Sequence, residues 1–477
     1  MHLDATRTAS VRQVPSPSSC TSTAGPRVIA DRGVCDGGER GIAKDANATV
    51  VSVDCRRAHG AEFPKDVAPQ CFGTAAVVEK TKPAQASAGE RLMQLSTAEA
   101  AASHFQPNFS KDIQMIKAMG FAAHHSFSRL KLTEFEREEA GAKEIEIAVK
   151  YCGVCHSDIH QAKNEWSNTV YPCMPGHEIV GTVTKVGPGV SLHKVGDLVG
   201  VGCMIDSCRE CAPCKAGEEN YCEGPNSWLA TYNGPMVPAK MAPTGENLYG
   251  RDNTMGGYSD VVVVKEDFVL KIPAALKPEV AAPILCAGVT TYSPMKHWKV
   301  KAGDKVGIIG FGGLGDMAAK IAKALGAQVT VFTRTEEKLE EAKRLGVQGV
   351  LESDKAAFKA LKSSFDFMLS TVPEKHDVNP FVALLKRDST LAVVGALEAL
   401  APVNNQEVAF HRKSVAGSLI GSIAETQEVL DFCAKHGIGP DVELIDIQEI
   451  NDAYKKVEKG DVRFRYVIDM ASLKAEA

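Results

Sequence analysis

The sequence has no uninterrupted apolar run of about 18 residues, the length that a membrane-spanning helix requires. Its N-terminus also lacks the hydrophobic core of a secretion signal. Acidic and basic residues are interspersed and the formal net charge is −5, so there is no basic stripe of the kind that binds nucleic acid. We therefore expect a cytoplasmic protein with neither a membrane nor a nucleic acid among its partners.

What is present is a chain of 477 residues with 44% hydrophobic content, enough for about three domains with buried cores. Residues 1–110 differ from the rest, because they are rich in Ala, Ser, Thr and Pro and show little periodicity. We expect this segment to be disordered or loosely structured. A gene-boundary artefact or a dispensable extension explains it better than a transit peptide, since acidic residues appear by Asp4 and Asp31.

The chain contains 14 cysteines, and without a secretion signal their clustering favours metal binding over disulfides. The stretch Tyr151–Glu178 combines thiol, imidazole and carboxylate groups, and its Cys155 and His177 each adjoin a strand-like run. A catalytic zinc takes three protein ligands and keeps one position open. The best third candidate is Cys286, although a cysteine in an apolar run is commonly a buried small hydrophobe.

A second cysteine group has the spacing C-x2-C-x2-C-x7-C. Four thiolates so close on one loop can close a tetrahedral site with no open position, as structural zinc requires. An iron–sulfur cluster is the alternative, but its sequence runs usually place the fourth cysteine differently. We expect one structural zinc, without a chemical role, held by Cys208, Cys211, Cys214 and Cys222.

Short β-branched runs between residues 115 and 264 predict a strand-rich, barrel-like domain. After residue 288 the pattern alternates between strands and helices. Strands are expected at 305–309, 328–332, 365–370, 390–394 and 415–421, with helices at 314–325 and 380–385, which together predict a doubly wound parallel sheet in an α/β protein. From about residue 423 a helix at 424–436, a helix at 447–459 and a strand at 464–469 are expected.

A glycine-rich turn between the first of these strands and its helix has the dinucleotide-binding pattern. Its first glycine permits the tight turn, the second lets the backbone approach a pyrophosphate, and the last allows close packing of helix on strand. The phosphates would meet the N-terminus of the helix. The turn residues expected at the cofactor are Gly310, Gly312, Gly313, Leu314 and Gly315.

Cofactor choice depends on the end of the second strand, where NAD-binding sheets place a carboxylate for the ribose hydroxyls. This chain has no acid there, which favours NADP. Glu336 and Glu337 follow closely, however, and one of them could bend back to the ribose. The residues expected to accommodate a 2′-phosphate are Thr333, Arg334, Thr335 and Lys338.

The segments Gly153–Asp158, Gly176–Glu178 and Leu285–Gly288 together resemble the catalytic-zinc motifs of the zinc-dependent medium-chain dehydrogenase/reductase family. More narrowly, residues 112–470 resemble its cinnamyl-alcohol-dehydrogenase-like branch of NADP-dependent alcohol dehydrogenases and aldehyde reductases. The resemblance implies a chaperonin-10-like β-barrel catalytic domain, a Rossmann coenzyme domain and a homodimer or homotetramer. The expected parts are an extension (1–110), the catalytic domain (111–287), the dinucleotide-binding domain (288–422) and a return to the catalytic domain (423–477).

The resemblance also implies roles for single residues. Ser157 would bond the substrate oxygen and His160 would pass the proton outward through the ribose, although Ser157 could instead be a local cap. Asp158 would orient the imidazole of His177, and Glu178 matches a glutamate that can approach zinc. Further matches are Thr290 beside the nicotinamide and Arg465 facing the pyrophosphate, for which a surface salt bridge is the alternative.

One position departs from the family pattern: Asp316 stands where a histidine is usual after the last glycine of the turn. Its charge could weaken cofactor binding, unless the side chain points outward. Trp166 is a candidate wall of an aromatic pocket, with core packing as the alternative. The Gly- and Pro-rich insertion at 227–255 could lie near the mouth of the site or be purely structural.

The expected function is zinc-dependent, NADP(H)-linked interconversion of primary alcohols and aldehydes, whether aromatic, cinnamyl or medium aliphatic. One catalytic and one structural zinc are expected. Two alternatives stay open: an NAD-linked polyol or formaldehyde-type dehydrogenase on the same scaffold, and a non-catalytic zinc redox sensor suggested by the cysteine count.

Overall fold

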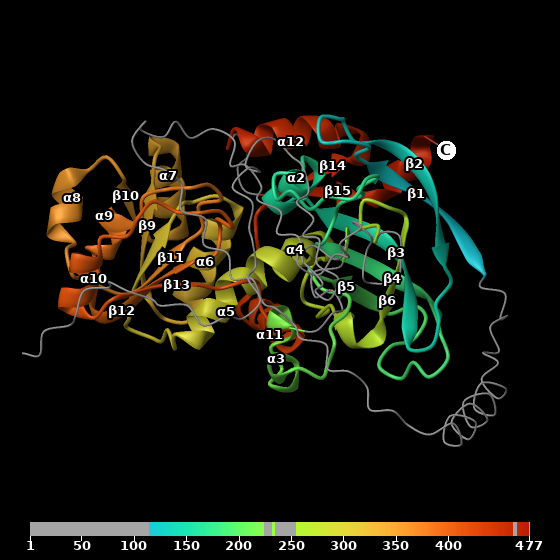
Figure 1. The fold of residues 1–477 in the computed structure, drawn as a ribbon, viewed down its shortest axis with the longest axis horizontal. Helices are drawn as coiled ribbons and strands as arrows, with labels where there is room; N and C mark the ends of the chain where they lie inside the picture. The colour runs from blue at the N-terminus through green and yellow to red at the C-terminus, as the bar shows by residue number, and fades with distance from the viewer. Residues whose placement is uncertain (1–113, 224–230, 234–253, 461–464, 477) are drawn as a thin grey trace, which may run out of the picture. The chain divides into compact units, whose positions relative to one another are not determined.

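The computed structural model of the chain describes residues 114–223, 231–233, 254–460 and 465–476. The extension expected at 1–110 and most of the insertion at 227–255 lie outside the described residues. Within the described part, the chain forms a two-stranded, a seven-stranded and a six-stranded sheet (Figure 1). No helix among the described residues is both long enough and apolar enough to cross a membrane.

The seven-stranded sheet belongs to the strand-rich part of the chain and is mostly antiparallel. Alternate residues of its central strand are buried, among them Ile145, Ile147 and Val149, as expected for a sheet with one face on the core. A separate hairpin of β1 (Met115–Ala122) and β2 (Lys131–Glu138) precedes it. The sheet order is β14-β15-β3-β4-β5-β7, with β6 also on β3, for β3 (Glu144–Gly153), β4 (Ile179–Val186), β5 (Leu198–Val201), β6 (Val261–Lys265), β7 (Leu270–Lys271), β14 (Val442–Asp446) and β15 (Arg465–Asp469).

The six-stranded sheet is parallel throughout, and its strands read as nearly continuous buried runs because helices cover both faces. The order β10-β9-β8-β11-β12-β13 reverses direction at β8, which creates a crevice at the carboxyl ends of β8 and β11. The strands are β8 (Lys305–Ile309), β9 (Gln328–Thr333), β10 (Gln348–Leu351), β11 (Phe365–Ser370), β12 (Leu385–Val393) and β13 (Ser414–Gly417). The helices between them are α6 (Gly313–Ala324), α7 (Glu336–Leu345), α8 (Lys355–Ala360), α9 (Asn379–Val382) and α10 (Asn405–His411), labelled in Figure 1.

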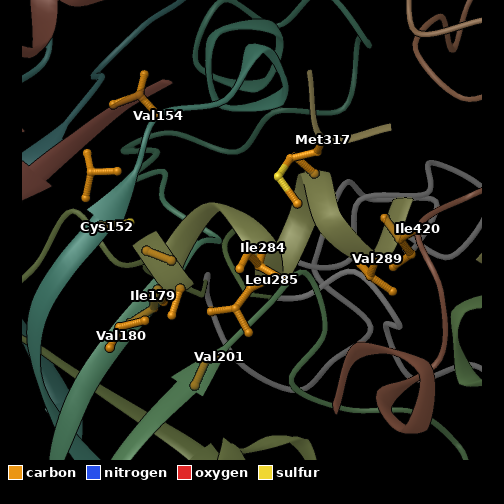
Figure 2. Packing of buried hydrophobic residues seen from close by; sticks show 14 of the residues in the cluster. Cys152, Val154, Ile179, Val180, Val201, Ile284, Leu285, Val289, Met317 and Ile420 are labelled. Carbon is orange, nitrogen blue, oxygen red and sulfur yellow. The ribbon is translucent and has the colours of Figure 1, made fainter. Parts of the chain in front are cut away.

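The segment between the two large sheets is helical, which the sequence did not predict. Helix α4 (Pro278–Pro283), the π-helical turn η4 (Ile284–Gly288) and α5 (Val289–His297) follow one another directly. Figure 2 shows Leu285 beside Val201 of β5, with Met317 of α6 on another side of the turn. This turn therefore joins the cores of the two sheets and fixes Cys286 between them.

The expected helix at 380–385 is wrong in its extent. Helix α9 ends at Val382, and Leu385 already begins β12, which ends at Val393 and so overlaps the strand expected at 390–394 in all but its last residue. Leu384 and Leu385 are both buried, and short apolar runs suit a buried helix or a buried strand equally well. The expected final elements are present as α11 (Ile423–His436), α12 (Ile450–Glu458) and β15.

The remaining elements of the described fold are short and helical. Helix α2 (His156–Ala162) follows β3, and helix α3 (Ala212–Lys215) with the single turn η1 (Glu219–Tyr221) lies in the four-cysteine segment. Single 3-10 turns occur at η3 (Glu266–Phe268) and η5 (Ile447–Glu449), and η6 (Met470–Glu476) is a longer 3-10 segment.

Candidate catalytic metal centre and nucleotide site

Four side chains from three separate segments converge in one buried cluster. The ligand-type atoms of Cys155, His177, Glu178 and Cys286 all lie within 4.8 Å of one another. His177 Nε2 and Cys286 Sγ are 3.2 Å apart. The three residues singled out in the sequence as a catalytic metal set are therefore brought together, although 109 residues separate His177 from Cys286.

Local structure explains the orientation of the Cys155 and His177 side chains. Cys155 is the N-cap residue of α2, so its side chain projects from the start of a helix rather than into the core. His177 lies in the loop before β4 and directs Nδ1 at Asp158 Oδ1, 2.9 Å away. A carboxylate at Nδ1 fixes the proton there and leaves the Nε2 lone pair facing the cluster.

The thiols of the cluster show the electrostatics of a metal site. A hydrogen bond from Cys286 lowers the pKa of Cys155, and the charge of Arg465 lowers it further, although burial raises it. The same hydrogen bond raises the pKa of Cys286. Two sulfurs and one imidazole nitrogen form a donor set that suits zinc in a catalytic site, so the residues present fit this ion.

Glu178 and Arg465 form a buried pair beside the cluster. Arg465 Nη1 is 3.2 Å from Glu178 Oε1 and donates to Val154 O at 3.1 Å. Burial raises the pKa of Glu178 to about 7, although Arg465 lowers it. Because Arg465 is only 5% exposed, the alternative of a surface salt bridge is wrong. Its Nε and Nη2 have no hydrogen-bond partner among the described residues, so it can still receive an anionic group.

Ser157 and His160 lie on the same short helix as the cysteine they follow. The Ser157 hydroxyl is 3.8 Å from Cys155 Sγ, so it stands at the edge of the cluster. His160 lies one turn further along α2, forms an ion pair with Glu165 through Nδ1 and is partly exposed. Trp166 packs against the His160 ring with centroids 5.5 Å apart. Helix α2 therefore carries one polar group at the cluster and another that is partly exposed to solvent.

The second cysteine set also converges. The Sγ atoms of Cys208, Cys211, Cys214 and Cys222 lie within 4.8 Å of one another. Backbone amides donate to three of these sulfurs: Cys208 N to Cys222, Cys211 N to Cys208, and Glu223 N to Cys211, at 3.3 to 3.4 Å. Backbone N–H groups lower the pKa of Cys208 to about 6. Sulfurs that receive amide donors are prepared to be thiolates, which fits a closed four-thiolate metal site.

The glycine-rich turn has the geometry expected of a phosphate-binding loop. Gly310 has φ +85°, a conformation that favours glycine, and a Cβ on Gly315 would lie 2.2 Å from Gly310 O. A Cβ on Gly312 would meet no atom within 4 Å. The space over Gly312 is thus open where a pyrophosphate would lie, at the N-terminus of α6, while Gly313 and Leu314 begin that helix.

The end of β9 presents hydroxyl and cationic groups. Thr333 is buried, Arg334 is exposed, and Thr335 caps α7 by accepting from Lys338 N. Lys338 Nζ is 2.8 Å from Glu341 Oε2 in the same helix, so its charge is partly engaged. Thr333 and the two residues after it carry no carboxylate, and Glu336 and Glu337 are exposed in the first turn of α7. Glu352, after β10, lies beside Thr333: its N donates to Thr333 O at 2.9 Å, and burial raises the pKa of its carboxyl while Arg334 lowers it.

Two further expected residues lie at the crevice. Thr290, in the first turn of α5, is buried, and its Oγ1 has no hydrogen-bond partner among the described residues, which leaves it available to a bound cofactor. Asp316 is buried rather than pointing outward, and its Oδ2 pairs with Lys320 Nζ at 2.8 Å. The carboxylate is therefore neither free nor exposed.

Sequence reasoning missed three side chains of the metal cluster. The Tyr258 hydroxyl donates to Asp158 Oδ2, the Tyr232 ring lies 5.6 Å from the His177 ring, and the thiol of Cys203 is a hydrogen-bond partner of Cys286. Tyr258 follows a Gly-Gly pair that allows close backbone approach, which was the only sequence signal for it. The other two carry no signal without the fold.

Two family descriptions match this chain. Residues 141–274 match the family described as "Alcohol dehydrogenase GroES-like domain" and residues 313–435 match "Zinc-binding dehydrogenase". Aldehyde reductase YahK of Escherichia coli is 47% identical over 363 residues, which cover 75% of this chain and 99% of the relative. NADP-dependent alcohol dehydrogenase C 1 of Mycolicibacterium smegmatis is 44% identical and covers 76% of this chain and 100% of its own length.

Solved structures agree with these matches. A cinnamyl alcohol dehydrogenase of Sorghum bicolor, SbCAD4, superposes with a TM-score of 0.69 at 42% identity, covering 75% of this chain and 98% of its own. A CAD from Helicobacter pylori complexed with NADP(H) superposes with a TM-score of 0.68 at 40% identity, covering 75% and 99%. The expected fold class, a chaperonin-10-like barrel with a doubly wound coenzyme domain, is confirmed.

Proposed function

The chain belongs to the zinc-dependent medium-chain alcohol dehydrogenase family, and from this membership we propose how its residues perform the reaction. The protein is an NADP-linked oxidoreductase that interconverts alcohols and aldehydes. The observation that carries the proposal is the convergence of Cys155, His177 and Cys286 in a buried cluster. These three residues hold the catalytic zinc, and the four-cysteine set holds a structural one.

When bound, zinc acts as a Lewis acid that polarises the substrate oxygen, and NADP(H) carries the hydride. The chain supplies position and charge. Asp158 holds the imidazole of His177 by its Nδ1 so that Nε2 faces inward. Glu178 stays beside the cluster with its charge partly offset by Arg465, whose two unpartnered nitrogens are free to receive a cofactor phosphate.

A proton must leave the buried site when an alcohol is oxidised. Ser157, at the edge of the cluster, would take this proton from the substrate oxygen while it gives up its own hydroxyl proton, so that the serine stays neutral. His160, one turn along α2 and partly exposed, takes it outward, and Glu165 stabilises the imidazolium that results. The hydroxyl and imidazole thus link a dry pocket to water.

NADP is held by the glycine-rich turn and the end of β9. The open space over Gly312 takes the pyrophosphate, and Arg334 with Thr333 and Thr335 accommodates the 2′-phosphate. Lys338 contributes less, because it is paired with Glu341. The NAD-linked alternative would require Glu336 or Glu337 to reach the ribose, yet both begin α7 with exposed side chains.

The substrate class that we propose is aromatic, cinnamyl or medium aliphatic aldehydes, with Trp166 close to the proton path. The names of the relatives support this range of substrates, because the relatives include an aldehyde reductase and cinnamyl alcohol dehydrogenases. We also propose that the protein acts in the cytoplasm as a homodimer or homotetramer. The relatives named above are enzymes, so a non-catalytic sensor has no support from them.

The decisive experiment measures initial rates of cinnamaldehyde and benzaldehyde reduction with NADPH and with NADH, on protein of determined zinc content. Strong NADPH preference together with two zinc ions per chain is the expected result. Preference for NADH would mean that a glutamate of α7 binds the ribose. No turnover with either cofactor, in protein that contains both ions, would overturn the proposed chemistry.

A further inference from the structure

Asp158 accepts hydrogen bonds from both the Cys155 segment and the His177 segment of the metal cluster. Its Oδ1 accepts from His177 Nδ1 at 2.9 Å and from Gly176 N at 3.0 Å, while its Oδ2 accepts from Cys155 N at 2.9 Å. The side chain is fully buried. A small rotation of this one carboxylate would therefore displace both a histidine ligand and a cysteine ligand at once.

A further donor closes this arrangement. The Tyr258 hydroxyl donates to Asp158 Oδ2 at 3.3 Å, opposite the amide of Cys155. Burial, followed by the charge of Asp158, raises the pKa of Tyr258 well above its ordinary value, so the hydroxyl keeps its proton and remains a donor. With this contact each carboxylate oxygen has a pair of donors, which fixes the plane of the carboxylate.

The backbone around Tyr258 leaves the side chain little freedom. Gly257 N donates to Gly176 O at 2.8 Å and Tyr258 N donates to Pro175 O at 3.0 Å. Gly176 has φ +103°, and a Cβ on it would come within 2.7 Å of Tyr258 N. Segment 256–259 is thus packed directly on the turn that carries His177, and it delivers the hydroxyl to Asp158 from the opposite side.

A second tyrosine supports the first. Tyr454 of α12 packs its ring against Tyr258 with centroids 6.5 Å apart, and both are buried. The Tyr454 hydroxyl itself has no hydrogen-bond partner among the described residues, so its ring supplies the support by packing. Helix α12, from the end of the chain, is in this way connected to the metal cluster through two phenol groups.

We propose that Tyr258 is a positioning residue for the catalytic metal: it fixes Asp158, and through Asp158 the orientation of His177 and Cys155, with Tyr454 in support. The inference rests on the proposed function, since it needs zinc at Cys155, His177 and Cys286. Removing the hydroxyl leaves Asp158 Oδ2 with one donor fewer and room to rotate. The metal is then held less firmly, while the scaffold is kept because the ring remains.

The test compares Tyr258→Phe with Tyr292→Phe in the zinc-loaded full chain. Tyr292 is a matched control, because its hydroxyl also donates to a carboxylate, Glu428 Oε1 at 2.7 Å, away from the metal cluster. Zinc release is followed with the chromogenic chelator 4-(2-pyridylazo)resorcinol, and the ion at the four-cysteine set serves as internal reference. We expect Tyr258→Phe to weaken zinc binding at the catalytic site alone by about tenfold, because the loss of a group that orients metal ligands commonly has an effect of this size. Tyr292→Phe should leave zinc binding at both sites unchanged.

Two further readouts separate positioning from general damage. Excess zinc should restore the kcat of Tyr258→Phe, and its KM for NADPH should match that of the unaltered protein. Equal zinc release by Tyr258→Phe and Tyr292→Phe would overturn the inference. If Tyr258→Phe does not fold, Tyr454→Leu, which removes the ring that packs on Tyr258, decides: weaker binding of the catalytic ion supports the inference, and unchanged binding refutes it. A parent protein that binds zinc only at the four-cysteine set would instead overturn the proposed function itself.

Discussion

Asp316 and Lys320 form a buried ion pair one turn apart on α6, with Oδ2 and Nζ 2.8 Å apart. Lys320 Nζ also donates to Gly439 O at 2.9 Å and lies 3.8 Å from Asp441 Oδ1, so it connects α6 to the segment between α11 and β14. Burial raises the pKa of Asp316 to about 6, against the effect of Lys320. The residue that departs from the family pattern is therefore balanced by a cation within its own helix.

This pairing predicts that Asp316→Asn changes the KM for NADPH by less than about twofold, because the positive charge of Lys320 already offsets the repulsion between Asp316 and the cofactor phosphates. Lys320→Met should instead destabilise the fold by about 3 kcal/mol, since it leaves a buried carboxyl without its partner. Initial-rate kinetics and thermal unfolding check the two statements. A several-fold drop in KM for Asp316→Asn would show that the carboxylate does repel the cofactor.

Much of this architecture was accessible from local sequence. The glycine pattern of residues 310–315 requires a particular turn, and the structure has it, with positive φ at Gly310 and close packing at Gly315. The four-cysteine set could be predicted from its spacing, which suits a tetrahedral metal site, whereas Cys155, His177 and Cys286 were grouped by their residue types and by the family resemblance. Helix α7 was overlooked although Thr335 caps it and charged residues follow at helical spacing.

The rest depends on contacts between distant segments. Neither the helical setting of Cys286 nor the pairing of Asp316 follows from neighbouring residues, because each is decided by what packs against it in space. The Tyr258 contact with Asp158 spans 100 residues. Such pairs are found only when the sheet order is known.

Cys155→Ser should abolish catalysis while leaving the fold intact. A Lewis acid is worth several kcal/mol, and each 1.36 kcal/mol is a factor of ten, so kcat should fall by about a thousandfold or more. Zinc analysis should show the loss of one ion per chain. Cys433→Ser, which alters a buried thiol in α11 that belongs to neither metal-binding set, is the control and should keep both ions. Retention of most turnover by Cys155→Ser would contradict the catalytic-zinc assignment.

Cys211→Ser should lower thermal stability before it lowers the rate. The four-cysteine lobe contacts the segment that leads into α11, since Asn220 Nδ2 donates to Leu419 O at 2.8 Å. Loss of its metal should therefore loosen this connection without changing the catalytic groups. We expect a drop in the melting temperature, loss of one zinc ion, and near-normal kcat in brief assays at low temperature. An immediate loss of kcat with unchanged melting temperature would assign the lobe a chemical role.

Arg334→Ala should raise the KM for NADPH and spare that for NADH. A charge-assisted hydrogen bond contributes about 1.5–3 kcal/mol, which corresponds to roughly a tenfold to hundredfold increase. Lys338→Ala is the matched control, because Lys338 is already bound to Glu341 and should matter less. Equal effects of the two variants on NADPH would mean that Lys338 leaves Glu341 when the cofactor binds.

Glu266 should control stability in acid. Burial raises the pKa of this carboxyl, but Lys143 Nζ at 2.8 Å and the amides of Ser191 and Leu192 lower it more strongly, to about 2. A carboxyl whose pKa is depressed on folding stabilises the protein above its unfolded pKa and loses that contribution as the pH falls towards the folded value.

Glu266→Gln should therefore cost about 2–3 kcal/mol at neutral pH, and this difference from the parent protein should shrink as the pH falls from about 4.5 towards 2. Thermal unfolding at pH 7, about pH 4 and about pH 2.5 measures it, because the last two values lie inside that window. Asp452→Asn removes a carboxyl whose pair with Lys455 is exposed, so it should have little effect at any of them. A difference for Glu266→Gln that is constant with pH would show that the carboxylate charge does not hold the 191–192 turn.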